Sequence, residues 1–219
     1  MNFVKLSTLI TTLVLSNLTL GSLDASSREI KGQYIQPDNI FPQVKFETNM
    51  GDMVFELDRS RARLTVNNFL GYVARGQYND TMFHRVEVDF VAQAGGFTTK
   101  YKEIEPGKEI INESGNGLKN EIGTISMARQ LQPHTATSQF FFNLNDNDSL
   151  DPGRRWGYAV FGEITQGEEV LEAIGQVEVG FDENLGYPTV PKKMLIIKRV
   201  TILKPEPLPE IKSEDEKNL

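Results

Sequence analysis

From Val44 onward the chain consists of short apolar runs, broken every few residues by Gly, Asn, Asp or Pro. Runs of this length are typical of β-strands joined by turns, because a helix needs longer stretches with a 3.6-residue period. The pattern therefore predicts a compact, mainly β sandwich or barrel. A chain of 219 residues with 39% apolar content can bury one substantial core, or at most two small ones.

Three strands can be placed within this pattern. Residues 44–48 and 52–57 form a predicted hairpin, with Gly51 in the turn. Residues 194–203 are rich in β-branched side chains and predict a long strand that closes the sheet.

Two segments have helical period instead. Residues 64–75 carry an apolar stripe, with Thr65 as the expected N-cap and Gly76 as the end of the helix. A second, shorter helix is expected at residues 168–174, with Val170, Leu171 and Ile174 facing inward.

The N-terminus has the features of a secretory signal. Lys5 is the only charged residue before Asp24, and an apolar run of about 15 residues follows it. The run is shorter than the roughly 20 apolar residues of a membrane span. We therefore expect a signal peptide over residues 1–25, cleaved after Ala25, and a periplasmic or secreted protein with no stable membrane insertion. An uncleaved anchor or a buried helix remains the alternative.

The other boundaries follow from composition. Residues 26–43 contain Gly32, Pro37 and Pro42 with little periodicity, so we expect a linker or loosely packed leader before a domain at 44–204. Residues 205–219 begin with alternating prolines and carry five acids against two lysines, which predicts a disordered acidic tail.

Composition excludes several classes of function. The formal charge is −7 without a cluster of Lys and Arg, so nucleic acid is not an expected partner. The absence of cysteine excludes disulfides, thiolate catalysis and a Cys-based zinc site. No metal or cofactor is expected, and nothing in the pattern indicates an obligate oligomer, so a monomer is expected.

Two segments carry the residues with functional potential. In the predicted strand 82–86, Phe83 and Arg85 should share one face while His84 points the other way. In 139–143, Gln139, Phe141 and Asn143 should share a face opposite the core residues Phe140 and Phe142. A face that offers an amide beside an aromatic ring suits a peptide-binding groove.

Each of these residues also has an ordinary structural interpretation. Arg85 could form a surface ion pair, Phe90 and Phe141 could belong to the core, and Gln93 could be a solvated amide. His84 is expected to be a buried, hydrogen-bonded structural residue. Neither histidine has a Ser and Asp arrangement that would indicate a hydrolase triad.

The order and spacing of several motifs resemble the cyclophilin family of peptidyl-prolyl cis-trans isomerases, from about Val44 to Leu203. The form of residues 154–162 is most similar to the bacterial branch, and the signal segment suggests its exported members. The motifs that carry the resemblance are Asn67-Asn68-Phe69-Leu70, Phe83-His84-Arg85-Val86, Phe90-Val91-Ala92-Gln93-Ala94-Gly95-Gly96-Phe97, Asn112-Glu113, Gly123-Thr124-Ile125-Ser126-Met127-Ala128-Arg129, Thr137-Ser138-Gln139-Phe140-Phe141-Phe142-Asn143, Asn147-Asp148-Ser149-Leu150-Asp151 and Gly157-Tyr158-Ala159-Val160-Phe161-Gly162.

The resemblance implies a closed eight-stranded antiparallel β-barrel capped by two α-helices, with the groove on its outer surface. It also implies proline-containing polypeptides as partners and catalysis by Arg85. The implied substrate-binding residues are Phe90, Val91, Gln93, Ala128, Arg129, Gln139, Phe141, Leu150 and Tyr158.

The chain departs from the family pattern in two places. Ser149 stands where many relatives carry an aromatic residue that contacts cyclosporin, so weak cyclosporin binding is expected, although Trp156 could partly replace the ring. Glu87-Val88-Asp89 replaces the usual Ile-Pro-Gly, which places two acids near the groove and could favour substrates with basic residues beside the proline.

Two functions remain open from the sequence. The first is an exported isomerase that rotates X-Pro bonds during folding of exported proteins. The second is a non-catalytic chaperone or assembly factor that only grips proline segments. Intact Arg85 favours the enzyme, and a hydrolase that uses His84 is the least favoured option.

Overall fold

The computed structural model describes residues 31–205, so the predicted signal peptide, residues 26–30 and residues 206–219 lie outside the described part. Ten strands form one curled sheet in the order β4-β5-β8-β7-β9-β2-β1-β12-β3-β6, and β10 pairs with β11 separately. The strands are β1 (Gln43–Thr48), β2 (Asp52–Leu57), β3 (Thr81–Met82), β4 (Arg85–Glu87), β5 (Val91–Ala94), β6 (Phe97–Thr98), β7 (Thr124–Met127), β8 (Phe140–Asn143), β9 (Ala159–Gln166), β10 (Val179–Asp182), β11 (Tyr187–Pro191) and β12 (Ile196–Ile202).

The ten segments amount to eight strands, because β3–β4 and β5–β6 are two arms of one interrupted hairpin. Arg85 pairs with Gln93 in one half, and Met82 pairs with Phe97 in the other. Between the halves, Gly95 has a φ of +78°, which glycine adopts without strain. In one half of the hairpin β5 pairs with β8, and in the other half β3 pairs with β12. The two edges of the sheet are therefore joined by the same hairpin, and the sheet curls into a barrel. The mainly β prediction is confirmed.

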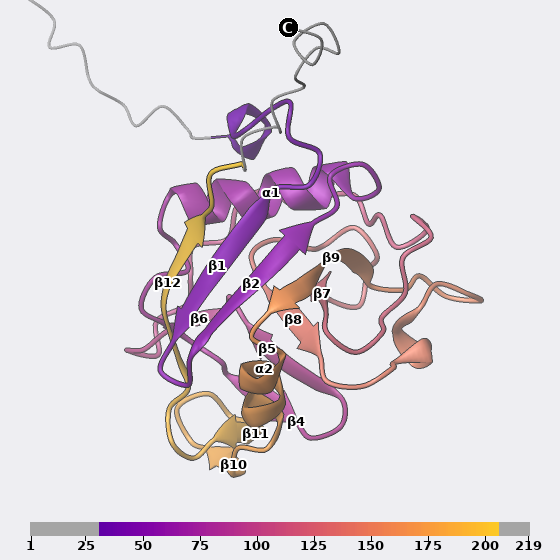
Figure 1. Ribbon diagram of the computed structural model, residues 1–219. Coiled ribbons are helices and arrows are strands. Elements are labelled where there is room, and N and C mark those ends of the chain that lie inside the picture. The colour runs from indigo at the N-terminus through magenta and orange to yellow at the C-terminus, as the bar shows by residue number, and fades with distance from the viewer. Residues whose placement is uncertain (1–30, 206–219) are drawn as a thin grey trace, which may run out of the picture.

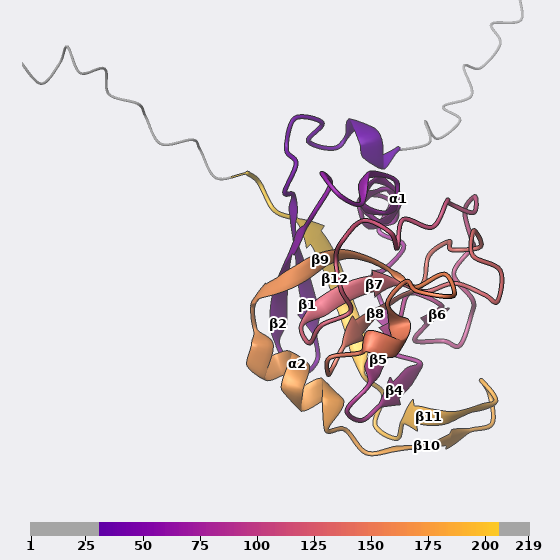
Figure 2. The same ribbon diagram turned by 90° about the vertical axis from the view of Figure 1, so that its right-hand side faces the viewer.

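Two α-helices cover opposite ends of the curled sheet, as both ribbon views show (Figures 1 and 2). They are α1 (Arg63–Ala74) and α2 (Glu168–Gly175), close to their predicted bounds. The predicted inward residues Val170, Leu171 and Ile174 of α2 are all buried. Short 3-10 helices span Gly32–Tyr34 (η1) and Asp148–Leu150 (η2).

The start of α1 differs from the prediction. Thr65 is not an N-cap but a buried residue inside the first turn. The carboxylate of Glu113 accepts hydrogen bonds from the backbone N–H groups of Leu64 and Thr65 at 3.1 and 2.8 Å, and from the Thr65 hydroxyl. These are the N–H groups that a local cap would satisfy, so a carboxylate 48 residues away in sequence caps the helix instead.

The barrel interior is filled by closely packed aromatic rings. Phe46, Phe55 and Phe142 are fully buried, with ring centroids 4.6 Å apart for Phe55–Phe142 and 5.3 Å for Phe46–Phe142. Phe69 of α1 adds its ring at 5.5 Å from Phe140. Because the interior is filled, a ligand site must lie on the outer surface.

The segment predicted as a loose leader is packed against the domain from residue 31 to residue 42. Arg59 is 7% exposed, and its guanidinium donates hydrogen bonds to the backbone oxygens of Ile35, Gln36 and Asn39. A Cβ on Gly32 would lie 1.8 Å from the Asn67 carbonyl oxygen of α1. The domain therefore begins before residue 44. The sequence pattern does not indicate this, because residues 31–42 are held by contacts with residues far along the chain.

Candidate active site

Three predicted site residues stand in one row across neighbouring strands. Arg85 of β4 pairs with Gln93 of β5, and Gln93 pairs with Phe141 of β8. Side chains at paired positions project from the same face of a sheet. Phe140 and Phe142 project from the opposite face into the core, as the alternation predicts.

Hydrogen bonds connect this row. Nη1 of Arg85 donates to the Gln93 side-chain oxygen at 3.1 Å, and the Gln93 amide nitrogen donates to the Gln139 side-chain oxygen at 2.8 Å. The Arg85 side chain is 31% exposed, so the guanidinium borders solvent while its stem is held. A charged donor held in this way can meet a substrate without first reorganising.

A second apolar cluster lies beside the row and is separate from the barrel core. Its buried members are Val91, Ala128 and Phe141, and Phe90, Leu150 and Tyr158 pack against them half-buried. The structure thus brings six of the predicted substrate-binding residues together in one partly exposed cluster of rings and aliphatic groups.

Arg129 closes one side of this cluster. Its guanidinium carbon lies 4.4 Å from the centre of the Tyr158 ring, which is edge-on to the Phe141 ring at 5.5 Å. The same guanidinium donates to the backbone oxygens of Trp156 at 2.6 Å and Gly157 at 3.2 Å. The side chain of Arg129 therefore fixes the loop that carries Tyr158.

A buried set of amides supports the opposite wall. The Asn147 amide donates to the Phe90 carbonyl oxygen and to the Asn143 side chain, at 2.9 and 2.8 Å. Asn143 is fully buried and is linked through Asn120 to Asp151, which lies just beyond Leu150. These amides fix the two loops that present Phe90 and Leu150, and their supporting role was not predicted. The many Asn residues in the quoted motifs were the feature of the sequence from which this role could have been predicted.

Glu87 is a partner of Arg85 that the sequence analysis did not identify as such. Its Oε1 accepts hydrogen bonds from Nε and Nη2 of Arg85 at 3.1 and 2.7 Å. Their spacing of two residues along a strand was sufficient to predict this contact. Of the two acids in the segment 87–89, Glu87 therefore forms an ion pair with Arg85 and Asp89 does not.

His84 lies behind the row. It is 1% exposed and packs against the rings of Phe97 and Tyr187. Burial, together with the nearby Arg85 charge, lowers the pKa of His84 to about 4, although a hydrogen bond with Gln139 acts in the opposite direction. His84 is therefore neutral at pH 7. It is buried as predicted, but its Nδ1 atom has no hydrogen-bond partner within residues 31–205.

One detail of the prediction is wrong. Phe83 does not share the face of Arg85 but is fully buried in the main core, because the strand is interrupted between β3 and β4. The exposed ring of Trp156 packs edge-on against His134 at 5.0 Å and lies outside the second apolar cluster. Ser149 is exposed at η2.

Within residues 31–205, no three His, Asp or Glu side chains are placed to hold a metal ion. In the same range, neither helix has the length and apolar character needed to cross a membrane.

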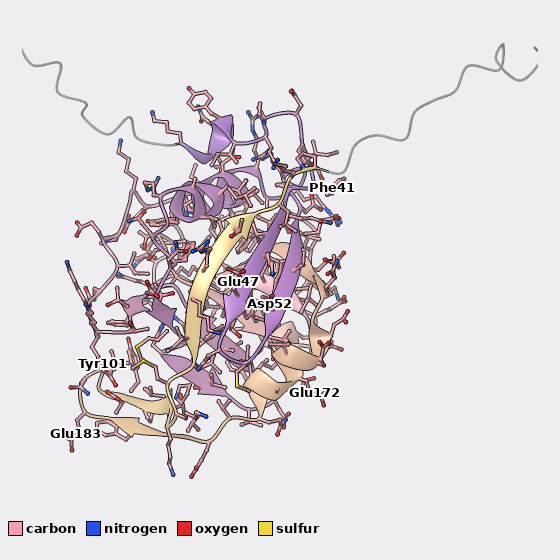
Figure 3. The ribbon with its side chains drawn as sticks, turned by 60° about the vertical axis from the view of Figure 1, so that its left-hand side comes forward. Phe41, Glu47, Asp52, Tyr101, Glu172 and Glu183 are labelled. Atoms are coloured by element: carbon pink, nitrogen blue, oxygen red, sulfur yellow. The ribbon has the colours of Figure 1, made fainter. Side chains whose placement is uncertain are left out.

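A separate cavity of about 820 Å³ lies between α2, β9 and the loop that contains Asp89. Its lining includes the apolar side chains of Leu144 and Ile164 and five acidic residues: Asp89, Glu163, Glu168, Glu169 and Glu172. Glu172 projects from α2 in Figure 3. The Leu144 backbone N–H donates to the Phe90 carbonyl oxygen, so this acid-lined cavity adjoins the second apolar cluster.

Comparisons with known proteins agree with this geometry. Residues 43–202 match the model of the family described as cyclophilin type peptidyl-prolyl cis-trans isomerase/CLD. The chain is 45% identical to peptidyl-prolyl cis-trans isomerase A of Dickeya dadantii, over 74% of this chain and 84% of the relative. It is 43% identical to an isomerase of Streptomyces antibioticus, over 73% of this chain and 98% of the relative.

A solved structure also matches. The cyclophilin type isomerase of Cryptosporidium parvum superposes with a TM-score of 0.63 at 28% identity, covering 75% of this chain and 99% of its own. The range matched by the family model, residues 43–202, contains β1 to β12, both α-helices and the row of Arg85, Gln93 and Phe141. The chain therefore belongs to the cyclophilin family of peptidyl-prolyl cis-trans isomerases.

Proposed function

We propose that the second apolar cluster forms a hollow on the outer surface where this protein rotates X-Pro peptide bonds, with Arg85 as the catalytic residue and no covalent intermediate. The observation that carries the proposal is the position of the Arg85 guanidinium, held by Gln93 in the same row as Phe141 of the second apolar cluster. A cation beside a ring-lined hollow is the arrangement that a twisted prolyl bond requires.

The chemistry follows from amide resonance. A planar X-Pro bond resists rotation by a barrier of about 18–20 kcal/mol. At the midpoint of rotation, conjugation is lost and a lone pair is localised on the prolyl nitrogen. The Arg85 guanidinium stabilises this lone pair and does not stabilise the planar forms in the same way. Stabilisation restricted to the transition state is what accelerates a reaction.

The remaining residues have binding roles in this proposal. Phe141, Val91, Phe90 and Leu150 hold the pyrrolidine ring so that the flanking chain rotates around it. Gln93 and Gln139, with the backbone at residues 128–129, hold the substrate chain. Lowering the barrier by about 5 kcal/mol would accelerate rotation several-thousand-fold. Positioning and a charged hydrogen-bond donor are sufficient for a gain of that size.

The relatives support the choice of ligand. The isomerase of Cryptosporidium parvum was crystallised in the presence of the dipeptide Ala-Pro, and it matches this chain with a TM-score of 0.62. We infer that proline-containing polypeptides occupy the hollow of this protein as well.

We further propose that the protein acts as a monomer outside the cytoplasm on exported proteins during their folding. The support is the charged and apolar pattern of residues 1–25. Sequencing the mature N-terminus by mass spectrometry tests this directly. A mature chain beginning near Ser26 supports export, and a chain that retains Met1 contradicts it.

The competing function is a chaperone or assembly factor that binds proline segments without turning them over. A protease-coupled assay with a proline peptide separates the two functions. Turnover by the wild-type protein supports the enzyme, whereas peptide binding without turnover would support the chaperone. The pairing of an intact Arg85 with Gln93 favours turnover, because a protein that only binds does not need a cation at that point.

A further inference from the structure

Glu87 makes the closest contact with the proposed catalytic residue. One carboxylate oxygen of Glu87 accepts hydrogen bonds from both Nε and Nη2 of Arg85, at 3.1 and 2.7 Å. The two residues are two positions apart on β4, so their side chains project from the same face. Both side chains are about two-thirds covered, with 31% of Arg85 and 37% of Glu87 exposed.

The contacts divide the guanidinium into held and free parts. Arginine has five N–H groups, one on Nε and two on each Nη nitrogen. Glu87 takes the Nε group and one Nη2 group, and Gln93 takes one Nη1 group. One N–H on each Nη nitrogen remains for a substrate. Glu87 and Gln93 therefore hold the planar group from two sides and leave donors available to the bound peptide.

We propose that Glu87 is a positioning residue that orients Arg85 for catalysis, an inference that rests on the proposed isomerase function. The negative charge of Glu87 also opposes the positive potential that Arg85 presents. This opposing effect is small, because the pair is partly exposed and solvent screens it. The orientation of Arg85 should affect the catalytic rate more than this opposing charge does, because small misplacements of a catalytic group have large effects on rate.

The test compares Glu87→Ala, Glu87→Gln and the wild-type protein on a neutral proline peptide, with kcat and KM measured by NMR exchange. Glu178→Ala is the control for the loss of a carboxylate from an ion pair, because Glu178 forms a largely exposed ion pair with Lys192 outside the site. We expect Glu87→Ala to lower kcat by about threefold to tenfold while KM changes less than about twofold. Glu87→Gln should fall between, because its amide oxygen can still accept from Nε. Glu178→Ala should match the wild type.

A second measurement does not depend on activity. The Arg85 Nε–H signal should exchange with solvent faster in Glu87→Ala than in the wild type. Wild-type turnover combined with an unchanged or raised kcat in Glu87→Ala would overturn this inference alone, as would an equal loss in Glu178→Ala. Absence of wild-type turnover would overturn the proposed function and this inference with it.

Discussion

Phe141 and Phe142 are adjacent in the chain but belong to different apolar clusters. Phe142 is fully buried in the barrel core, stacked on Phe55 at 4.6 Å. Phe141 packs with Val91 and Tyr158 in the second apolar cluster. The pleat of β8 thus separates the side chain that stabilises the fold from the side chain that lines the hollow.

This separation predicts different consequences for two neighbouring substitutions. Phe142→Ala should lower the free energy of unfolding by about 3–5 kcal/mol, as large deletions in a packed core do. Phe141→Ala should cost roughly half as much, because its cluster is smaller, but should weaken peptide binding about tenfold or more. Denaturant unfolding and peptide titration measure the two effects. Equal losses of stability and unchanged binding in Phe141→Ala would contradict the assignment.

His84 predicts a pH dependence of stability. Its pKa falls from 6.5 in the unfolded chain to about 4 in the folded protein, so only the unfolded chain takes up the proton between these values. The contribution of neutral His84 to the free energy of unfolding is fully present above about pH 6.5. We expect the free energy of unfolding to decrease by roughly 3 kcal/mol as the pH falls to about 4. Unfolding measured across this range should show a shallower slope for His84→Gln. Identical slopes would show that another group is responsible.

Asp89 predicts a preference among substrates. Glu87 is paired with Arg85, so Asp89 is the acid left to act on a bound peptide, and it also lines the acid-lined cavity. Peptides with Lys or Arg beside the proline should therefore be turned over about twofold to fivefold better than peptides with Glu at low ionic strength. Asp89→Asn should remove most of the difference, and an undiminished preference in that variant would contradict the prediction.

Ser149 predicts weak cyclosporin binding. The residue is exposed on η2, next to Leu150 of the hollow, and has no ring to contact a large apolar ligand. Trp156 packs edge-on against His134 and is not part of the second apolar cluster. Titration should give an affinity weaker than nanomolar, and Ser149→Trp should tighten it about tenfold or more. Nanomolar binding by the wild-type protein would contradict the prediction.

Local pattern was sufficient for a large part of the fold. The hairpin of β1 and β2, both helices and the alternation of residues 139–143 depend on near neighbours in sequence, and the sequence predicts them. Lys45 lies 2.7 Å from Asp52 across that hairpin, and Figure 3 shows Glu47 and Asp52 on the paired strands. Such pairs are implied by the hairpin register itself.

Contacts between distant segments were not predictable in the same way. Glu113 caps α1 from a loop, and Arg59 holds residues 35–39, so neither contact has a periodic signal in the sequence. Phe83 points into the core because the strand is interrupted between β3 and β4. On one side of the interruption β3 pairs with β12, and on the other side β4 pairs with β5. For the site, the resemblance to a family supplied the candidate residues, and the structure shows which of them lie together.

The most direct test of the account is the exchange rate of a proline peptide measured by NMR with wild-type, Arg85→Lys and Arg85→Ala proteins. Lysine keeps the charge but lacks the planar fork that Gln93 and Glu87 hold. We expect Arg85→Ala to lower kcat about a hundredfold or more and Arg85→Lys to recover little of it, while both bind the peptide within about threefold of the wild type. Full turnover by Arg85→Ala, with the peptide still bound in the hollow, would contradict the account.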